Sequence, residues 1–233
     1  MPNVKNLVLP GSYQEAIRRM RTLAAITISL LCFSTSSSAQ DIDEIRSQAR
    51  SGNPTAQFQL GRYYENLSDK ERDQKRAVDW YSRAAEQDSA RAQFSLGRMY
   101  ILGKGVPRDE ARGVEWQLKA AEQGLAEAQQ EIGRRYYTGV DLEQDLELAL
   151  ELFTKAANQR LVSAQKQLGT IYFQGAGVAK DLVKAHMWFS IAAQNNDQSA
   201  QRYLSILESV MDDSQIENSR ALAAQWQIDH TAE

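Results

Sequence analysis

Few residues in this chain are able to carry acid–base or metal chemistry. The 233 residues include two histidines, His186 and His230, and a single cysteine, Cys32. The sequence patterns typical of zinc hydrolases (H-E-x-x-H), serine hydrolases (G-x-S-x-G) and phosphate loops do not occur. We therefore expect a structural or solvated role for His186, and we predict no catalytic residue, no metal site and no cofactor. A hydrolase is a remote alternative.

Three of the four tryptophans follow a regular spacing. Trp80, Trp116 and Trp188 occupy equivalent positions of a 36-residue period. Indoles exposed on one surface would suggest sugar stacking, so a cell-wall or polysaccharide-binding protein is the alternative function. Small residues flank each indole, as Ala77 and Ala84 flank Trp80, which favours packing between helices. We expect these indoles to lie in the core.

A column of basic residues offers a different chemistry. Arg62, Arg98 and Arg134 recur at the same period and are followed by Thr170. Stacked repeats would set these side chains roughly 10 Å apart along one surface. Arginine is enriched at protein interfaces, and a basic stripe on an acidic protein favours an acidic partner.

The neighbouring column is expected to add apolar and aromatic contacts to the same surface. The predicted protein-binding residues are Arg62, Arg98 and Arg134 with Tyr63, Met99, Arg135 and Ile171. In the alternative interpretation each arginine pairs with a nearby glutamate, as Glu131 and Arg135 would at a spacing of four residues.

These columns belong to an internal repeat that determines the architecture. Alanine recurs every 36 residues from Ala56 to Ala200, and four units share a Leu/Ile-Gly pair followed by a tyrosine, as in Leu60, Gly61 and Tyr64. This spacing puts the apolar residues on one face of a helix. We predict an all-α fold, a right-handed α-solenoid of four 36-residue helix-hairpin repeats over residues 54–197.

Equivalent residues are expected to have the same packing and capping roles in each repeat. The mid-helix glycine permits close approach of a neighbouring helix, and the tryptophan fills the gap between backbones lined by small residues. Predicted N-caps are Asn53 before Pro54 and the aspartates that precede the second helices, Asp73, Asp109, Asp145 and Asp181. Glycine loops of the second and fourth units require positive φ, whereas the first unit lacks glycine there and the third has Asp141, so we expect altered turns in both.

A ladder of glutamines also follows the period. Its members are Gln57, Gln93, Gln129, Gln165 and Gln201. They would bind a peptide backbone or bond between adjacent helices, and we favour the second role.

The ends of the solenoid need covering helices. Residues 40–53 are predicted to form an N-terminal capping helix and residues 198–228 the C-terminal capping helices, leaving 229–233 as a tail.

Residues 1–39 resemble a secretory signal, because basic residues precede an apolar run that ends in small residues before Gln40. Translation from Met20 would give a signal of ordinary length. Removing residues 1–39 leaves 23 basic and 29 acidic residues, and this charge of −6 disfavours binding to nucleic acid or anionic lipid.

The repeat resembles the Sel-one-like repeat, a relative of the tetratricopeptide repeat. Residues 96–121 and 168–193 match its pattern L-G-x-x-Y-x-x-G-x-G-V-x-x-D-x-x-x-A-x-x-W-x-x-x-A-A closely. The resemblance implies a non-enzymatic, monomeric scaffold in the periplasm or secreted, without a membrane anchor after signal cleavage. Such a scaffold would bind another protein on its concave first-helix surface, as adaptor or regulator of an envelope or signalling complex.

Overall fold

The computed structural model describes residues 41–67 and 70–230, and every regular element in these ranges is a helix. The predicted signal sequence lies outside the described residues. A helix over residues 41–50 precedes ten further helices: α2 (Pro54–Glu65), α3 (Lys70–Ala85), α4 (Ala90–Leu102), α5 (Glu110–Glu122), α6 (Ala126–Thr138), α7 (Leu146–Asn158), α8 (Val162–Gln174), α9 (Leu182–Ala193), α10 (Gln198–Glu208) and α11 (Asp213–His230).

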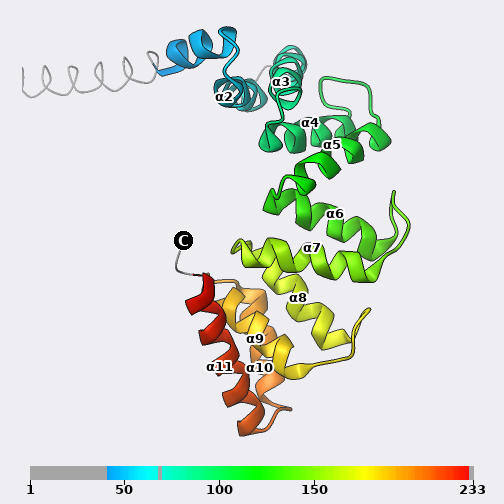
Figure 1. Ribbon diagram of the computed structural model, residues 1–233, viewed down its shortest axis with the longest axis vertical. Coiled ribbons are helices and arrows are strands. Elements are labelled where there is room, and N and C mark those ends of the chain that lie inside the picture. Colours follow the sequence, from blue (N-terminus) through cyan, green and yellow to red (C-terminus); the bar gives the residue numbers. More distant parts are fainter. Residues whose placement is uncertain (1–40, 68–69, 231–233) are drawn as a thin grey trace, which may run out of the picture.

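Eight of these helices pair into four hairpins, α2 with α3, α4 with α5, α6 with α7 and α8 with α9. Each second helix also packs against the first helix of the following hairpin. Figure 1 shows the hairpins following one another along a curved path from α2 to α9. The predicted all-α solenoid of four repeats is confirmed.

The side chains that pack on the first-helix glycines are not the tryptophans, which corrects that prediction. A Cβ atom added at Gly61 would lie 2.6 Å from the ring of Tyr81, and one at Gly169 would lie 2.9 Å from the ring of Phe189. Tyr81 and Phe189 are fully buried. They directly follow the tryptophan column, and neighbouring residues on a helix point roughly 100° apart, so only one of the two columns faces the glycine.

The tryptophans lie instead along the surface of the second helices. Trp80 and Trp116 are half-buried, with the guanidinium of Arg83 4.8 Å and the ammonium of Lys119 4.4 Å from the ring centroids. These two rings therefore pack against the core without lying inside it. Only Trp188 is buried as predicted, because α11 covers it.

Three of the four predicted aspartate caps are confirmed. The carboxylates of Asp109, Asp145 and Asp181 accept hydrogen bonds from backbone N–H groups of the first turns of α5, α7 and α9. Asp73 is not a cap, because α3 begins at Lys70 and encloses it. Without a loop glycine in this unit, the second helix starts earlier.

The third loop keeps the geometry of the glycine loops, contrary to our expectation. Gly139 and Asp141 have φ of 70° and 64°, close to the 74° and 77° of Gly175 and Gly177. Asp141 therefore adopts the left-handed conformation in which the other units use glycine, as aspartate does more readily than most residues.

Buried glutamines connect successive repeats, which supports their structural role. Gln57, Gln93, Gln129 and Gln165 donate to the backbone carbonyls of Ala49, Ala85, Ala121 and Ala157 at 3.2, 3.2, 3.5 and 3.3 Å. A second row, Gln87, Gln123 and Gln159, donates to the side-chain oxygens of the first three. The shorter Asn195 stands next in that row, and the Oε1 atom of Gln165 is buried without a hydrogen-bond partner. Gln201 is exposed.

Helices cover both ends of the described solenoid. Ala49, from the helix over residues 41–50, is buried against Ala56 and Leu60. At the other end α10 packs on α9, and α11 turns back to lie along α9 (Figure 1). Helix α11 reaches His230, so the ordered fold extends two residues beyond the predicted boundary at Ile228.

Candidate protein-binding surface

The three column arginines all lie exposed on first helices, Arg62 on α2, Arg98 on α4 and Arg134 on α6. Two of them make ion pairs. Arg98 bonds to Glu65 of the preceding first helix at 2.5 Å, and Arg134 bonds to Glu131 of its own helix at 2.6 Å. The interpretation in which nearby glutamates pair with the column therefore holds in part. Exposed pairs of this kind contribute little to stability and can exchange partners.

A groove of about 290 Å³ brings two of these arginines together between α2 and α4. The structure places Arg62 and Arg98 in it and leaves Arg134 outside. Sequence reasoning missed the other members that give the groove its character, Phe58, Phe94 and Arg91. The two phenylalanines precede the two arginines by four residues, a helical spacing that puts each pair on one face. That spacing was the available signal.

The groove combines an apolar wall with a positive edge. Phe58 and Phe94 are half-buried, and the guanidinium of Arg62 lies 5.9 Å from the Phe58 ring centroid. The lining contains three arginines against two glutamates, Glu65 and Glu127. An acidic segment with an apolar or aromatic side chain complements this arrangement.

Hydrogen bonds from Tyr81 and Arg98 fix the carboxylate of Glu65. The hydroxyl of the buried Tyr81 donates to Glu65 Oε2 at 2.7 Å, while Oε1 accepts from Arg98. Burial and the hydrogen bond to this carboxylate raise the pKa of Tyr81, so the hydroxyl stays a donor. Glu65 thereby orients the guanidinium of Arg98 along the groove.

The neighbouring column does not form part of this surface, and that prediction is wrong for three of its four residues. Met99 and Ile171 are 1% exposed and Arg135 is 4% exposed. Met99 packs against α3 and Ile171 against α7, because this column faces the second helix of the preceding repeat. Tyr63 is half-buried against the helix over residues 41–50, beside Ile42 and Ile45.

His186 has the expected structural role. It is 1% exposed and joins three helices, because its Nδ1 lies 2.7 Å from Ser219 Oγ on α11 while Nε2 lies 3.6 Å from Glu208 of α10. Burial lowers the pKa of His186, although Glu208 opposes this effect.

Across residues 41–67 and 70–230, no cluster of three or more acidic, histidine or cysteine side chains is arranged to hold a metal ion. Nor does any described helix combine the length and apolarity needed to cross a membrane.

The repeat units match a known family over most of the described chain. The Sel1 repeat model matches four consecutive segments, residues 54–89, 90–125, 126–161 and 162–197. These matches cover more than half of the chain, which therefore belongs to the Sel1 repeat family. Members of this family are generally non-enzymatic scaffolds that mediate protein–protein interaction.

Two solved structures resemble the chain in sequence and in fold. One is c5321 of uropathogenic Escherichia coli, a protective antigen with the same repeat fold, at 35% identity and a TM-score of 0.69 over 81% of this chain and 40% of that one. The other is a Sel1 repeat protein from Oxalobacter formigenes, at 35% identity and a TM-score of 0.67 over 72% of this chain and 49% of that one. The chain thus spans less than half the length of either protein. No curated protein sequence matches it.

Proposed function

We propose that this protein is an exported adaptor that binds an acidic, partly apolar segment of another protein in the groove between α2 and α4. The observation that carries the proposal is the convergence of Arg62, Arg91 and Arg98 with Phe58 and Phe94 in that groove. Exposed arginines supply steering and directional hydrogen bonds, and the phenylalanines supply apolar contact. Family membership supports a protein as the ligand.

The site of action in this proposal is the periplasm or the medium outside the cell. The proposal rests on the basic and apolar pattern of residues 1–39, which resembles a secretory signal. There the protein would act as an adaptor or regulator of an envelope or signalling complex, working as a monomer. Arg134 continues the arginine column one repeat further and would extend the contact for a longer partner.

A crosslinking pull-down from envelope extracts tests the groove directly. The bait is the chain from Gln40 to Glu233, compared with a triple variant in which Arg62, Arg91 and Arg98 are changed to Glu. A matched control changes the exposed Arg50, Arg108 and Arg202 to Glu, which shifts the net charge equally outside the groove. We expect a specific protein to be retained by the wild type and the control and lost by the groove variant.

The interaction should also weaken as salt rises, because it depends on exposed charges. Circular dichroism must show equal helicity for all three proteins. Equal recovery by wild type and groove variant would exclude this surface. Recovery of glycan instead of protein would favour the cell-wall-binding alternative.

A further inference from the structure

The surface of the second helices departs from the repeat pattern at one place. In the first, second and fourth units a cation lies over the column tyrosine: Arg76 is 5.4 Å from the Tyr64 ring centroid, Arg112 is 4.6 Å from that of Tyr100, and Lys184 is 5.2 Å from that of Tyr172. In the third unit the equivalent residue beside Tyr136 is the uncharged Leu148. The tryptophan column also changes there, to Leu152.

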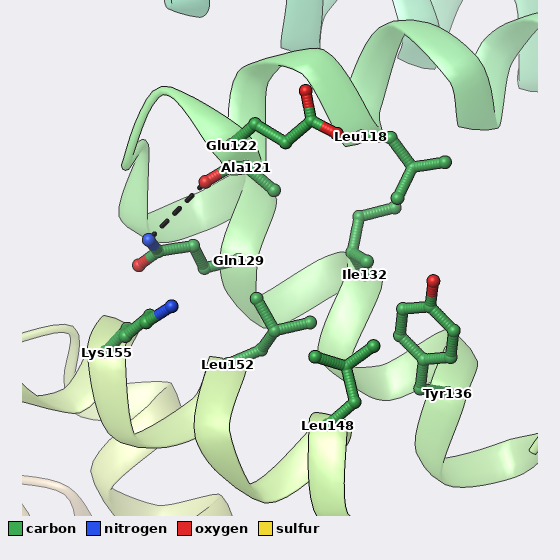
Figure 2. Close-up of a pocket in the computed structure, with 9 residues that line it drawn as sticks. All are labelled: Leu118, Ala121, Glu122, Gln129, Ile132, Tyr136, Leu148, Leu152 and Lys155. Carbon is green, nitrogen blue, oxygen red and sulfur yellow. Dashed lines mark hydrogen bonds between the residues drawn. The ribbon is translucent and has the colours of Figure 1, made fainter. Parts of the chain in front are cut away.

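These two changes accompany a pocket of about 470 Å³ that is lined by residues of α5, α6 and α7. Figure 2 shows the side chains of Leu118, Leu148, Leu152 and Tyr136 around it. Glu122 and Lys155 also line the pocket and supply charge. The volume falls within the range of about 300–1,000 Å³ that is typical of ligand pockets in proteins.

One repeat further along, the equivalent position is occupied by the chain's own last helix. The residues 36 positions after five lining residues of the pocket are Ala157, Leu168, Tyr172, Trp188 and Ile191. All five belong to a single core cluster that also contains Ala223 and Trp226 of α11.

Trp226 is the anchor of that contact. Its ring centroid lies 5.7 Å from that of Trp188 in an edge-to-face arrangement, and its Nε1 donates to Asn158 Oδ1 at 3.0 Å. Asn158 stands 36 residues after Glu122. The pocket between α5 and α7 therefore has a carboxylate at the position where the fourth-repeat site has the acceptor of the indole N–H.

We propose that the pocket between α5 and α7 is a docking site for a tryptophan-bearing amphipathic helix of a partner protein. The partner's indole enters between α5 and α7 as Trp226 enters between α7 and α9, and its N–H donates to Glu122. Leu118, Leu148 and Leu152 supply the apolar wall. This is the helix-in-groove mode of recognition, in which a buried tryptophan commonly provides much of the affinity.

The pocket is available to another chain because α11 is fixed elsewhere. The Ser219 hydroxyl bonds to His186 at 2.7 Å and Trp226 bonds to Asn158, so α11 stays on the fourth repeat. The proposed docking site uses second helices, and it is independent of the arginine groove on the first helices.

A peptide with the sequence of α11, residues 213–230, is a defined probe for this pocket. Fluorescence anisotropy of the labelled peptide would measure its binding to the chain from Gln40 to Glu233. Leu152→Glu places a carboxylate in the apolar wall of the pocket, where no unit of the repeat carries a charge. Leu102→Glu is the matched control, because it adds the same side chain at a leucine that is 53% exposed and outside the pocket.

We expect the peptide to bind wild type and Leu102→Glu equally, and to bind Leu152→Glu at least about 10-fold more weakly. A peptide with alanine in place of its tryptophan should lose binding to the same extent. Leu118→Glu, on the α5 side of the pocket, gives a second test if thermal unfolding shows Leu152→Glu to be misfolded.

Equal binding by wild type and both pocket variants would mean that the peptide exchanges with α11, and it would overturn the proposal. Absence of binding up to about 1 mM peptide would do the same. Concentration-dependent dimerisation of the wild type that Leu152→Glu abolishes would assign the pocket to a second copy of this chain instead of a partner protein.

Discussion

At the scale of single residues, Arg135 and Asp141 show how one departure from the repeat pattern accompanies another. Arg135 occupies a column that is otherwise Tyr63, Met99 and Ile171, and it is buried nearly as deeply as Met99 and Ile171. Its guanidinium bonds to Asp141 in the following loop and lies 3.4 Å from Glu131. A buried charge needs such partners, which explains an aspartate where the second and fourth loops have glycine.

Asp141→Gly should therefore destabilise the protein although it restores the residue of the other loops and relieves a left-handed aspartate. We expect a loss of about 2 kcal/mol in the free energy of unfolding, because one partner of a buried charge is removed. The double variant Arg135→Met, Asp141→Gly should recover most of that loss. Urea denaturation of the two single variants and the double variant measures the coupling. Additive effects would contradict the pairing.

At the scale of helices, the hairpins differ in how closely their two backbones approach. Gly133 faces the ring of Phe153, and a Cβ atom there would lie 3.2 Å from it. In the second unit Gly113 and Gln117 replace the alanine and the aromatic residue of the other hairpins. A Cβ atom at Gly97 would lie 2.6 Å from the Gly113 carbonyl oxygen and 2.8 Å from the Gln117 side chain. The tight contact between α4 and α5 thus includes backbone, which cannot rotate away.

Gly97→Ala should consequently be the more harmful of two chemically identical substitutions. We expect it to lower the free energy of unfolding by about 2 kcal/mol, through forced separation of α4 and α5. For Gly133→Ala the phenyl ring can shift, and the higher helix propensity of alanine, about 1 kcal/mol, offsets the strain. Thermal and urea unfolding of both variants provide the comparison. Equal losses would show that the close backbone approach is unimportant.

At the scale of the whole molecule, stability is distributed over neighbouring units. Each hairpin packs on the next, and at each of the three junctions between repeats a glutamine of the following repeat donates to the backbone of the preceding one, through Gln93, Gln129 and Gln165. Such an array behaves as a series of nearest-neighbour contacts, without a single central core.

Deletion of residues 126–161 should therefore give a shorter but folded protein. Leu125 and Leu161 are equivalent, so the new junction to Val162 keeps the register, and Gln165 would meet the carbonyl of Ala121 in place of Ala157. We expect unchanged helicity per residue and a smaller radius of gyration in X-ray scattering. The control deletes half a unit, residues 126–143, and should lose cooperative unfolding. Collapse of both deletions would refute the modular description.

The arginine groove was easier to predict from the sequence than the pocket between α5 and α7. The exposure of Arg62 and Arg98 followed from their column, and the groove they share could have been found from Phe58 and Phe94 one turn earlier. The sequence shows that Leu148 and Leu152 depart from two columns of the repeat. It does not show that a pocket forms beside them, because the pocket also depends on the positions of α5 and α6. A helical period states which residues share a face, and it does not state which neighbour covers that face.

The sequence by itself determined the number of units, their 36-residue register, the helix caps at Asp109, Asp145 and Asp181, and the solenoid. It could do so because these features depend on contacts within a unit or between adjacent units, which repeat identically. Only the tertiary structure decided that Met99, Arg135 and Ile171 are buried, that Tyr81 and Phe189 pack on the glycines, and that α11 turns back over α9. Those outcomes depend on how helices rotate and cross, which side-chain packing sets and spacing alone does not.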